Sequence, residues 1–178
     1  MADPADPADT AETTLDTPLG RLSLLAGPRG LRRVRFPGER TEAGPSAAGP
    51  VPGGGGAEEW LRIAVAQVRE YFAGARTRFD LALDPVGTPF QLAAWGVLRT
   101  IPYGTTISYG EQARRVGDAR KARAVGGANG RNPIPIVVPC HRVIGSGGAL
   151  VGFGGGTDAK AWLLDHERTV LCRRGGEP

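Results

Sequence analysis

The sequence predicts a two-part α+β (or α/β) fold: a small N-terminal α/β domain of short antiparallel strands plus a helix, packed on a mostly helical C-terminal domain with a helix-turn-helix. Apolar residues alternate in two short stretches between Leu19 and Phe36. They recur at helical spacing between Leu61 and Phe72. Further on, two capping signatures each open a short helical pattern. The length of 178 residues fits one ordinary domain or two small ones.

The N-terminal domain is expected over residues 15–85. Residues 1–14 repeat Asp, Pro and Ala before Thr and Glu, with almost nothing to bury, which predicts a disordered tail. Two alternating stretches then flank the turn Gly27-Pro28-Arg29-Gly30, and they predict a β-hairpin. Their apolar residues are Leu19, Leu22, Leu24 and Leu25, then Leu31, Val34 and Phe36.

Residues 37–57 predict a flexible insert, because 11 of these 21 residues are Gly or Pro. An amphipathic helix is expected from Glu58, with Gly74 placed as its C-terminal cap. Its apolar face consists of Leu61, Val65, Val68 and Phe72. Residues 77–83 alternate as a strand does, and residues 84–87 read as a linker.

The C-terminal domain is expected over 86–171, with a short tail at 172–178. Thr88-Pro89-Phe90-Gln91 combines a Thr cap, Pro at the first helical position and Gln three residues after the cap. Ser108-Tyr109-Gly110-Glu111 opens a second helix, which Gly117 ends, and Asp118 caps another over 119–128. Two short helices joined by a Gly turn predict a helix-turn-helix, although many helical hairpins bind no DNA.

Basic side chains concentrate in the second half of the chain. The net charge is +4, but residues 1–85 hold 10 basic and 12 acidic residues, whereas 86–178 hold 12 and 6. Between Arg99 and Arg142 lie eight basic residues against only Glu111 and Asp118. This asymmetry favours an acidic partner such as nucleic acid, with a solvated basic face as the alternative.

Several classes of protein are excluded. No apolar run is long enough for a membrane helix and no export signal is present, so a soluble protein of the cytoplasm is expected. Cys140 and Cys172 are then expected to be free thiols. There is no Cys-x-x-Cys, the two Cys and two His lack zinc-finger spacing, and the glycine runs are not followed by Gly-Lys-Ser/Thr, so a metal site and a nucleotide P-loop are unsupported.

Cys140 is the candidate nucleophile. It follows a buried-strand-like run, Ile136–Val138, and Pro139, which ends regular strand pairing. His141 offers an adjacent general base, and neighbouring arginines supply a positive field that favours the thiolate, namely Arg123, Arg131 and Arg142. The alternative is a small core residue, which is what most buried cysteines are.

Three stretches stand beside the helix-turn-helix: Asn132-Pro133, Pro139-Cys140-His141-Arg142-Val143 and Trp162-Leu-Leu-Asp-His-Glu167. Together they resemble the O6-alkylguanine-DNA alkyltransferase family (methylated-DNA-protein-cysteine methyltransferases). The resemblance covers about 86–171 and is only architectural over 15–85. It implies DNA repair by direct damage reversal, in which the alkyl group of O6-alkylguanine, and of O4-alkylthymine, moves irreversibly to the protein's own cysteine without a cofactor or metal.

The resemblance also implies the catalytic roles. Cys140 corresponds to the alkyl acceptor. His141 corresponds to the histidine that takes the thiol proton through a water, and Glu167 to the carboxylate that orients it. Asn132 matches the asparagine that ties the active-site turn together beside the cysteine. The product is a thioether that nothing hydrolyses, so one molecule is expected to repair one lesion.

On the DNA side, Tyr109 matches the tyrosine that serves the leaving guanine and helps to rotate the nucleotide. Arg123 matches the arginine that fills the gap left in the base stack. The small surface of the second helix, with Ala122 and Gly126, implies docking of double-stranded DNA through the minor groove, and Arg131 adds positive charge. Recognition is expected to be independent of sequence, and the protein to be a monomer.

Val143, Phe153 and Gly154 are expected to line the substrate pocket. The family often has an aromatic hydroxyl followed by a small polar residue where this chain has Phe153-Gly154, so only backbone amides are left there to contact the O6 region. Two other functions compete with the enzyme. A non-enzymatic alkylated-DNA-binding relative would lack the acceptor cysteine, and a DNA-binding regulator would need neither Glu167 nor the Pro-Cys-His-Arg turn.

Overall fold

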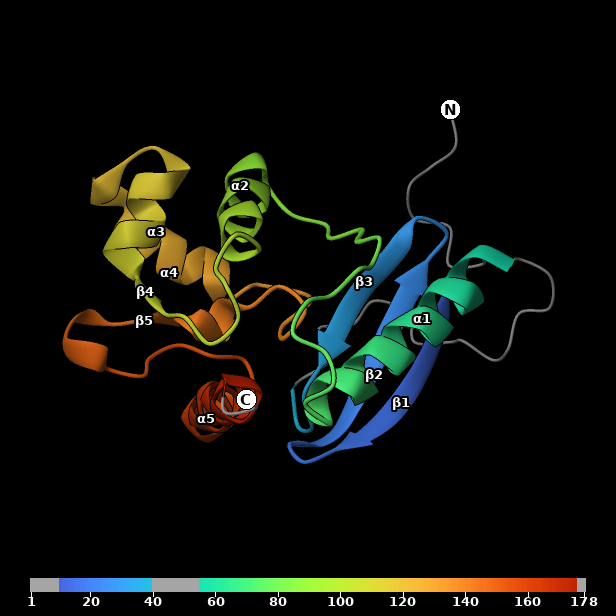
Figure 1. Cartoon of the computed structure of the whole chain (residues 1–178). Helices are drawn as coiled ribbons and strands as arrows, with labels where there is room; N and C mark the ends of the chain where they lie inside the picture. Colours follow the sequence, from blue (N-terminus) through green and yellow to red (C-terminus); the bar gives the residue numbers. More distant parts are fainter. Residues whose placement is uncertain (1–9, 40–54, 176–178) are drawn as a thin grey trace.

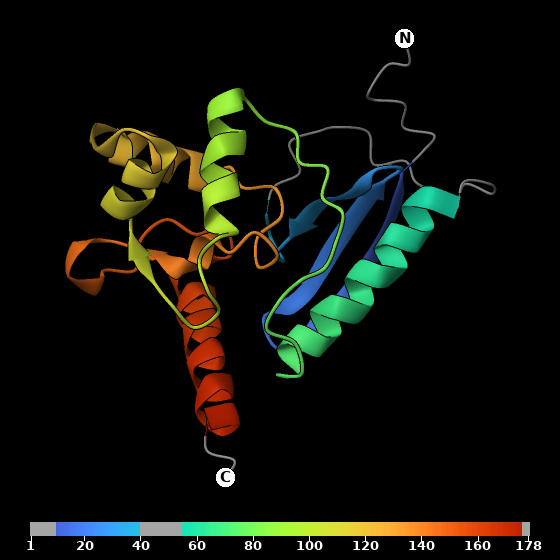
Figure 2. The same ribbon diagram turned by 45° about the horizontal axis from the view of Figure 1, so that its top comes forward.

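The computed structural model describes residues 10–39 and 55–175 (Figure 1). An antiparallel sheet covered by one helix forms the N-terminal part, and short helices with a long last helix form the C-terminal part (Figures 1 and 2). One hydrophobic cluster runs through both parts and joins Leu24 and Phe36 of the first to Trp95, Leu98 and Ile134 of the second. The predicted fold class is confirmed.

The N-terminal sheet has three strands in the order β1-β2-β3, all antiparallel: β1 (Ala11–Thr17), β2 (Gly20–Gly27) and β3 (Gly30–Arg35). The hairpin expected around Gly27–Gly30 is β2–β3. The disordered tail predicted over 1–14 is wrong for residues 11–14, because they begin β1, which pairs with β2 along its whole length. In this strand Leu15 is the buried residue, so ladder hydrogen bonds rather than an apolar pattern define it.

Helix α1 (Gly55–Phe72) crosses one face of the sheet (Figures 1 and 2). Its inner side chains are buried, namely Leu61, Ala64, Val68 and Tyr71. The helix starts before the predicted Glu58 and takes in the end of the predicted insert 37–57, of which residues 40–54 lie outside the described part of the chain. Gly74 follows the helix with a φ of 73°, as its assignment as a C-terminal cap requires.

The strand predicted over 77–83 is wrong. This segment forms a single isolated parallel bridge, between Leu83 and Leu31, and no ladder. Backbone bonds from Leu31 N to the carbonyl of Ala82 and from Asp84 N to the carbonyl of Leu31, both 2.9 Å long, fix it beside β3. Side chains in this segment alternate between the core and solvent, as they do in a strand. The segment is nevertheless an extended stretch that lies along the edge of the core.

The C-terminal part opens with α2 (Pro89–Leu98), where both hydrogen bonds of the predicted capping box between Thr88 and Gln91 are present. Strand β4 (Ile107–Ser108) leads into α3 (Tyr109–Val116), capped by Ser108 and ended by Gly117 at a φ of 113°. The helix predicted over 119–128 is two elements, a 3-10 turn η2 (Ala119–Lys121) and α4 (Ala122–Asn129). The helix pair expected of a helix-turn-helix is α3 and α4.

The buried strand expected at Ile136–Val138 is also wrong. These residues are buried, but they form turns, and Ile136 has a φ of 74°, which an extended strand does not allow. Pro133 and Pro135 have no N–H to give to a ladder. The run was apolar because it sits in the core.

The chain continues through the 3-10 turn η3 (Cys140–Arg142), β5 (Val143–Ile144), which pairs in parallel with β4, and the 3-10 turn η4 (Ser146–Gly148). The last helix, α5 (Gly156–Gly175), extends into the predicted tail 172–178, so Cys172 is helical and exposed. Within the residues described, no helix is long and apolar enough to cross a membrane.

Candidate active site

The turn that carries Cys140 is held by the side chain of Asn132. Its Nδ2 donates to the carbonyl of Val138 (2.8 Å) and lies 3.1 Å from Cys140 Sγ, while its Oδ1 accepts from Ile134 N (3.1 Å). Backbone groups that a strand would have paired are therefore taken by one amide side chain. The result is a fixed thiol, 3% exposed, at the start of η3.

The Cys140 thiol is protonated at neutral pH. Burial raises the pKa of Cys140 to about 11, and the Asn132 hydrogen bond and the Lys160 charge offset this only in part. The expected positive field of Arg123, Arg131 and Arg142 does not produce a thiolate, because the first two are exposed and Arg142 is paired with Glu167. Nucleophilic attack therefore requires a base that removes the thiol proton.

His141 is oriented as such a base. Its Nε2 lies 2.7 Å from Glu167 Oε1, and both side chains are fully buried. Glu167 is ionised, so Nε2 carries the proton of this hydrogen bond and Nδ1 keeps its lone pair. Nδ1 is buried and has no partner among the described residues. Burial lowers the pKa of His141 against the opposing effect of Glu167, so the ring is neutral and able to accept a proton.

Glu167 is a buried carboxylate surrounded by donors. Arg142 donates from Nε to Oε2 (3.0 Å) and from Nη2 to Oε1 (3.0 Å), and Gly104 N donates to Oε2 (2.8 Å). The Tyr71 hydroxyl, from α1, donates to Oε1 at 2.9 Å. Burial alone would raise the pKa of Glu167, but the bonds and charges of His141 and Arg142 prevail and lower it to about 2.

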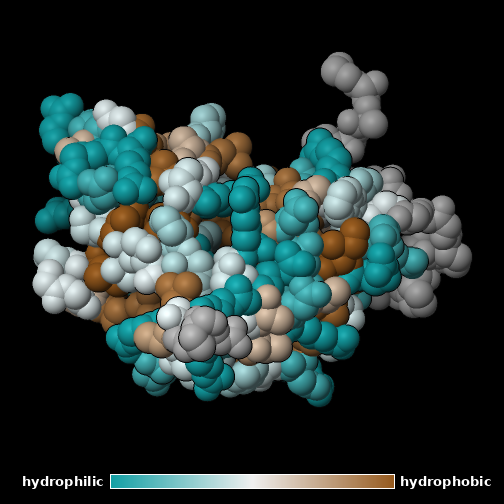
Figure 3. Space-filling view, viewed as in Figure 1, coloured by the Kyte–Doolittle hydropathy of each residue, from teal (hydrophilic) through white to brown (hydrophobic). Residues whose placement is uncertain are grey.

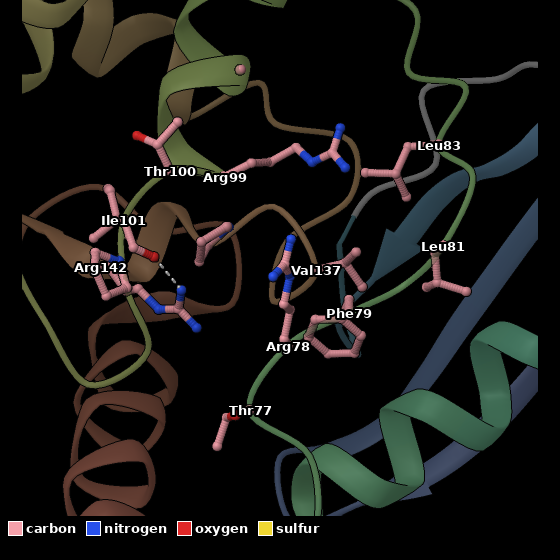
Figure 4. Close-up of a pocket in the computed structure, with 13 residues that line it drawn as sticks. Thr77, Arg78, Phe79, Leu81, Leu83, Arg99, Thr100, Ile101, Val137 and Arg142 are labelled. Atoms are coloured by element: carbon pink, nitrogen blue, oxygen red, sulfur yellow. Dashed lines mark hydrogen bonds between the residues drawn. The ribbon is translucent and has the colours of Figure 1, made fainter.

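Arg142 also borders a cleft of about 460 Å³ between the two parts of the chain. Its Nη1 donates to the carbonyl of Ile101 at 2.7 Å, the bond drawn in Figure 4. Arg78 and Arg99 reach into the same space from opposite parts of the chain (Figure 4). Cys140 does not line this cleft. The cleft therefore lies beside the ion pair of Arg142 and Glu167 and not at the thiol.

Of the predicted pocket residues, Val143 directly follows the cysteine turn and Phe153 lies near His141, while Gly154 follows Phe153 in the loop. Lys160, fully buried on α5, donates from Nζ to the carbonyls of Val143 (2.6 Å) and Val151 (2.9 Å). The Tyr109 hydroxyl donates to the same Val151 carbonyl at 2.9 Å. The Phe153 ring has its centroid 6.4 Å from that of His141. Lys160 thus joins β5 to the loop 151–155, which leads to α5.

Of the residues expected to face DNA, Tyr109 begins α3 and the others lie on and after α4. Arg123 is exposed and makes no ion pair with any residue described, whereas Arg114 and Arg115 on α3 pair with Glu111. A Cβ on Gly126 would stand 3.7 Å from the Tyr109 ring, an ordinary van der Waals distance, so α4 passes close to the tyrosine at this residue. Ala122 is half-buried, and Arg131 is exposed and donates to the carbonyl of Gly127 at 3.3 Å. Hydrophilic residues gather over α3 and η2 (Figure 3).

Two family models match the chain. The ribonuclease-like domain of 6-O-methylguanine DNA methyltransferase matches residues 11–85, and the DNA binding domain of the same enzyme matches residues 89–169. The chain belongs to this family.

Curated relatives of the alkyltransferase family cover most of the chain. The methylated-DNA--protein-cysteine methyltransferase of Mycobacterium tuberculosis (strain H37Rv) is 46% identical over 156 residues, 88% of this chain and 91% of the relative. That of Mycobacterium leprae is 47% identical over 155 residues, 87% and 90% of the two chains. A crystal structure of the M. tuberculosis O6-methylguanine methyltransferase matches with a TM-score of 0.77 and 45% identity, over 90% of this chain and 93% of that one. The structure of the M. tuberculosis protein in complex with DNA matches with a TM-score of 0.76 and 44% identity, over 89% and 93%.

Two partners of Glu167 in this alkyltransferase were missed by the sequence analysis. Tyr71 occupies a position on the inner face of α1, where an aromatic residue reads as core, and 96 residues separate it from Glu167. Gly104 contributes only its backbone N–H, which no residue type reveals. The sequence predicts that the charge of Arg142 acts on the thiol, whereas in the structure it pairs with Glu167. Its position two residues after the cysteine indicates only that it lies near the site. The described residues contain no group of His, Cys, Asp and Glu side chains suited to hold a metal ion.

Proposed function

We propose that the protein repairs DNA by transferring the alkyl group of O6-alkylguanine, and of O4-alkylthymine, to Cys140. The observation that carries this proposal is a buried, protonated thiol beside a neutral histidine whose free ring nitrogen has no protein partner in the described structure. Glu167 fixes the orientation of that histidine. The family assignment gives the reaction, and the geometry supplies the groups that it needs.

In the proposed reaction His141 Nδ1 takes the thiol proton through a water, and Cys140 Sγ attacks the alkyl carbon in line with the bond to O6. The S–C bond forms as the C–O6 bond breaks, and guanine keeps the electron pair. The base is then protonated, with the Tyr109 hydroxyl as the nearby donor, so the overall change moves one proton from sulfur to guanine. The thioether is stable, and each molecule acts once.

The DNA is bound through its minor groove with α4 as the inserted helix, and the lesion is rotated out of the stack. Ala122 and Gly126 leave the backbone of α4 close to the groove, and the unpaired Arg123 fills the gap in the stack. Arg131 and other exposed cations that make no ion pair within the described residues contact phosphates, so binding is independent of sequence and weakens with salt. The protein acts as a monomer.

The test is the mass of the intact protein after mixing with a duplex that contains O6-methylguanine. The expected result is a gain of one methyl group, located on the peptide that contains Cys140 and absent in Cys140→Ala. Cys172→Ala, which removes the exposed cysteine, serves as the control and is expected to react like the wild type. Tight binding to the duplex without a change in mass would contradict the enzyme and favour a protein that only recognises the lesion.

Replacing Arg123 separates base rotation from chemistry. We expect Arg123→Ala to slow repair of duplex DNA by roughly tenfold or more while it leaves the reaction with free O6-benzylguanine nearly unchanged, because only the duplex requires unstacking, at a cost of a few kcal/mol. Arg120→Ala is the matched control, since Arg120 is exposed but paired with Asp118. Equal losses with the duplex and the free base would refute this role for Arg123.

A further inference from the structure

We propose that Glu39 makes the alkyl pocket selective by charge, so that neutral alkyl groups are transferred much faster than anionic groups of the same size. This inference rests on the proposed function and names a substrate class for it. Glu39 belongs to the N-terminal part of the chain, just after β3, and lies against the loop that is expected to line the pocket.

The position of the Glu39 carboxylate is defined by two contacts. Its Oε2 accepts a hydrogen bond from Phe36 N at 3.1 Å, which closes a tight turn. Its Oε1 occupies the place where a side chain on Gly154 would begin, because a Cβ built on that glycine would collide with it. Glu39 is therefore in direct contact with the pocket loop.

The same loop is packed on the N-terminal part at its neighbouring residues. The Phe36 and Phe153 rings meet edge to face with centroids 5.3 Å apart. A Cβ on Gly155 would stand 2.9 Å from the Phe36 ring, so this glycine too is needed for close approach. The turn that holds Glu39 is thus fixed against the loop.

The charge of Glu39 has a small effect at the acceptor thiol. It adds to the larger effect of burial in raising the pKa of Cys140. No ion pair to Glu39 is present within residues 10–39 and 55–175. Lys160, the cation that acts on Cys140, is bonded to the carbonyls of Val143 and Val151.

Gly154 carries no side chain, and the space that a side chain would take at this point of the loop is filled by a carboxylate from the N-terminal part of the protein. A polar group is therefore present at the loop, but it is charged. Repulsion of like charges discriminates against a competing substrate without any new contact to the preferred one.

During transfer, Sγ bonds to the first carbon of the alkyl group as the bond from that carbon to O6 breaks. The rest of the alkyl group then has to lie near Sγ and the loop. A methyl or other neutral group meets no penalty from Glu39. A carboxymethyl group brings a second carboxylate into the same space, and the repulsion between the two like charges opposes its approach. The carbamoylmethyl group has the same shape without the charge.

The test compares three duplexes, with O6-methylguanine, O6-carboxymethylguanine and O6-carbamoylmethylguanine, and follows the rate of mass gain of the intact protein. In the wild type the carbamoylmethyl group is expected to react much faster than the carboxymethyl group. Glu39→Gln is expected to reduce this ratio by roughly tenfold. Glu58→Gln, which changes an exposed carboxylate in the first turn of α1, at the opposite end of that helix from Tyr71, is the matched control and is expected to keep the wild-type ratio.

An unchanged ratio in Glu39→Gln, with normal transfer of methyl, would overturn the role of Glu39 and leave the proposed function intact. Absence of methyl transfer by the wild type would overturn the function itself. A double-mutant cycle tests the contact directly. A Cβ on Gly154 would displace the Glu39 carboxylate, so Gly154→Ala is expected to reduce the carbamoylmethyl-to-carboxymethyl ratio in the wild-type background and to change it no further once Glu39→Ala has removed the carboxylate. Equal changes of the ratio in the two backgrounds would contradict the contact.

Discussion

Glu167→Gln is expected to lower the free energy of unfolding by about 3 kcal/mol or more at pH 7, because it leaves Arg142 as a buried charge without a counter-ion. The neutral amide keeps the shape of the side chain, so loss of charge is the main change. Urea denaturation of the two proteins measures the difference. Asp165→Asn is the matched control on the same helix: its ion pair with Arg168 is exposed, and about 1 kcal/mol or less is expected.

The difference between the wild type and Glu167→Gln should depend on pH. The pKa of Glu167 is about 2 in the folded protein, against an ordinary value of 4.5. The carboxylate therefore stabilises the fold above pH 4.5, and this stabilisation is lost as the pH falls from 4.5 towards 2. The gap between the two unfolding curves should narrow over this range. A gap that stays constant down to the acid limit, or one no larger than that of Asp165→Asn, would contradict the ion-pair explanation.

His141→Ala is expected to slow alkyl transfer by about 10²–10⁴-fold at pH 7, the usual contribution of a general base. The deficit should shrink as the pH rises towards the Cys140 pKa of about 11, since the thiolate then forms without a base. The wild-type rate should be nearly constant through neutral pH and fall only below the ordinary histidine pKa of 6.5, because burial lowers the pKa of His141 and the protonated ring accepts no proton. Free O6-benzylguanine as the substrate removes DNA binding from the measurement.

The control for this profile is His166→Ala. His166 lies on α5, with its ring bonded to the carbonyl of Tyr71 at 2.8 Å and stacked on Trp162, whereas the ring that bonds to Glu167 is that of His141. Its removal should leave the shape of the pH–rate curve unchanged. If His141→Ala were slow but ran parallel to the wild type at every pH, the histidine would be acting on the position of Cys140 and not on its proton.

The sequence predicts best those elements whose determinants are local. The box of Thr88 and Gln91 and the Ser108 cap are bonds between groups three residues apart, so they are visible in the printed order of residues. Strand β1 is different, because nearly all its definition comes from pairing with β2 and very little from its own side chains. An apolar run also predicts a strand wrongly where a side chain takes the backbone hydrogen bonds that a neighbouring strand would make. Asn132 does so at Ile134 N and at the carbonyl of Val138.

The candidate site divides in the same way. The residues themselves mark Cys140 and His141 as candidates, the family resemblance adds Asn132 and Glu167, and the structure brings Asn132 to Cys140 and Glu167 to His141. The electrostatics were predicted with the wrong sign: a cluster of arginines in the sequence suggested a thiolate, but the charge of Arg142 is cancelled by Glu167 and burial dominates at the sulfur. Tyr71 and Glu39 come from the N-terminal part, and only the packing of that part against the C-terminal part brings Tyr71 to Glu167 and Glu39 to Gly154.

The Tyr71 hydroxyl bond to Glu167 limits how this protein can be divided. A fragment that begins near residue 86 would contain the acceptor cysteine, the base and the whole C-terminal helical part, yet Glu167 Oε1 would lose a donor and the bonded carboxylate would border an opened face. Truncated or chimeric alkyltransferases built on this scaffold should therefore keep α1 together with α5. The interface between the two parts has to be kept whole in such a design. A chimera joined at the linker alone would lose the Tyr71 bond to Glu167, the carboxylate that orients His141.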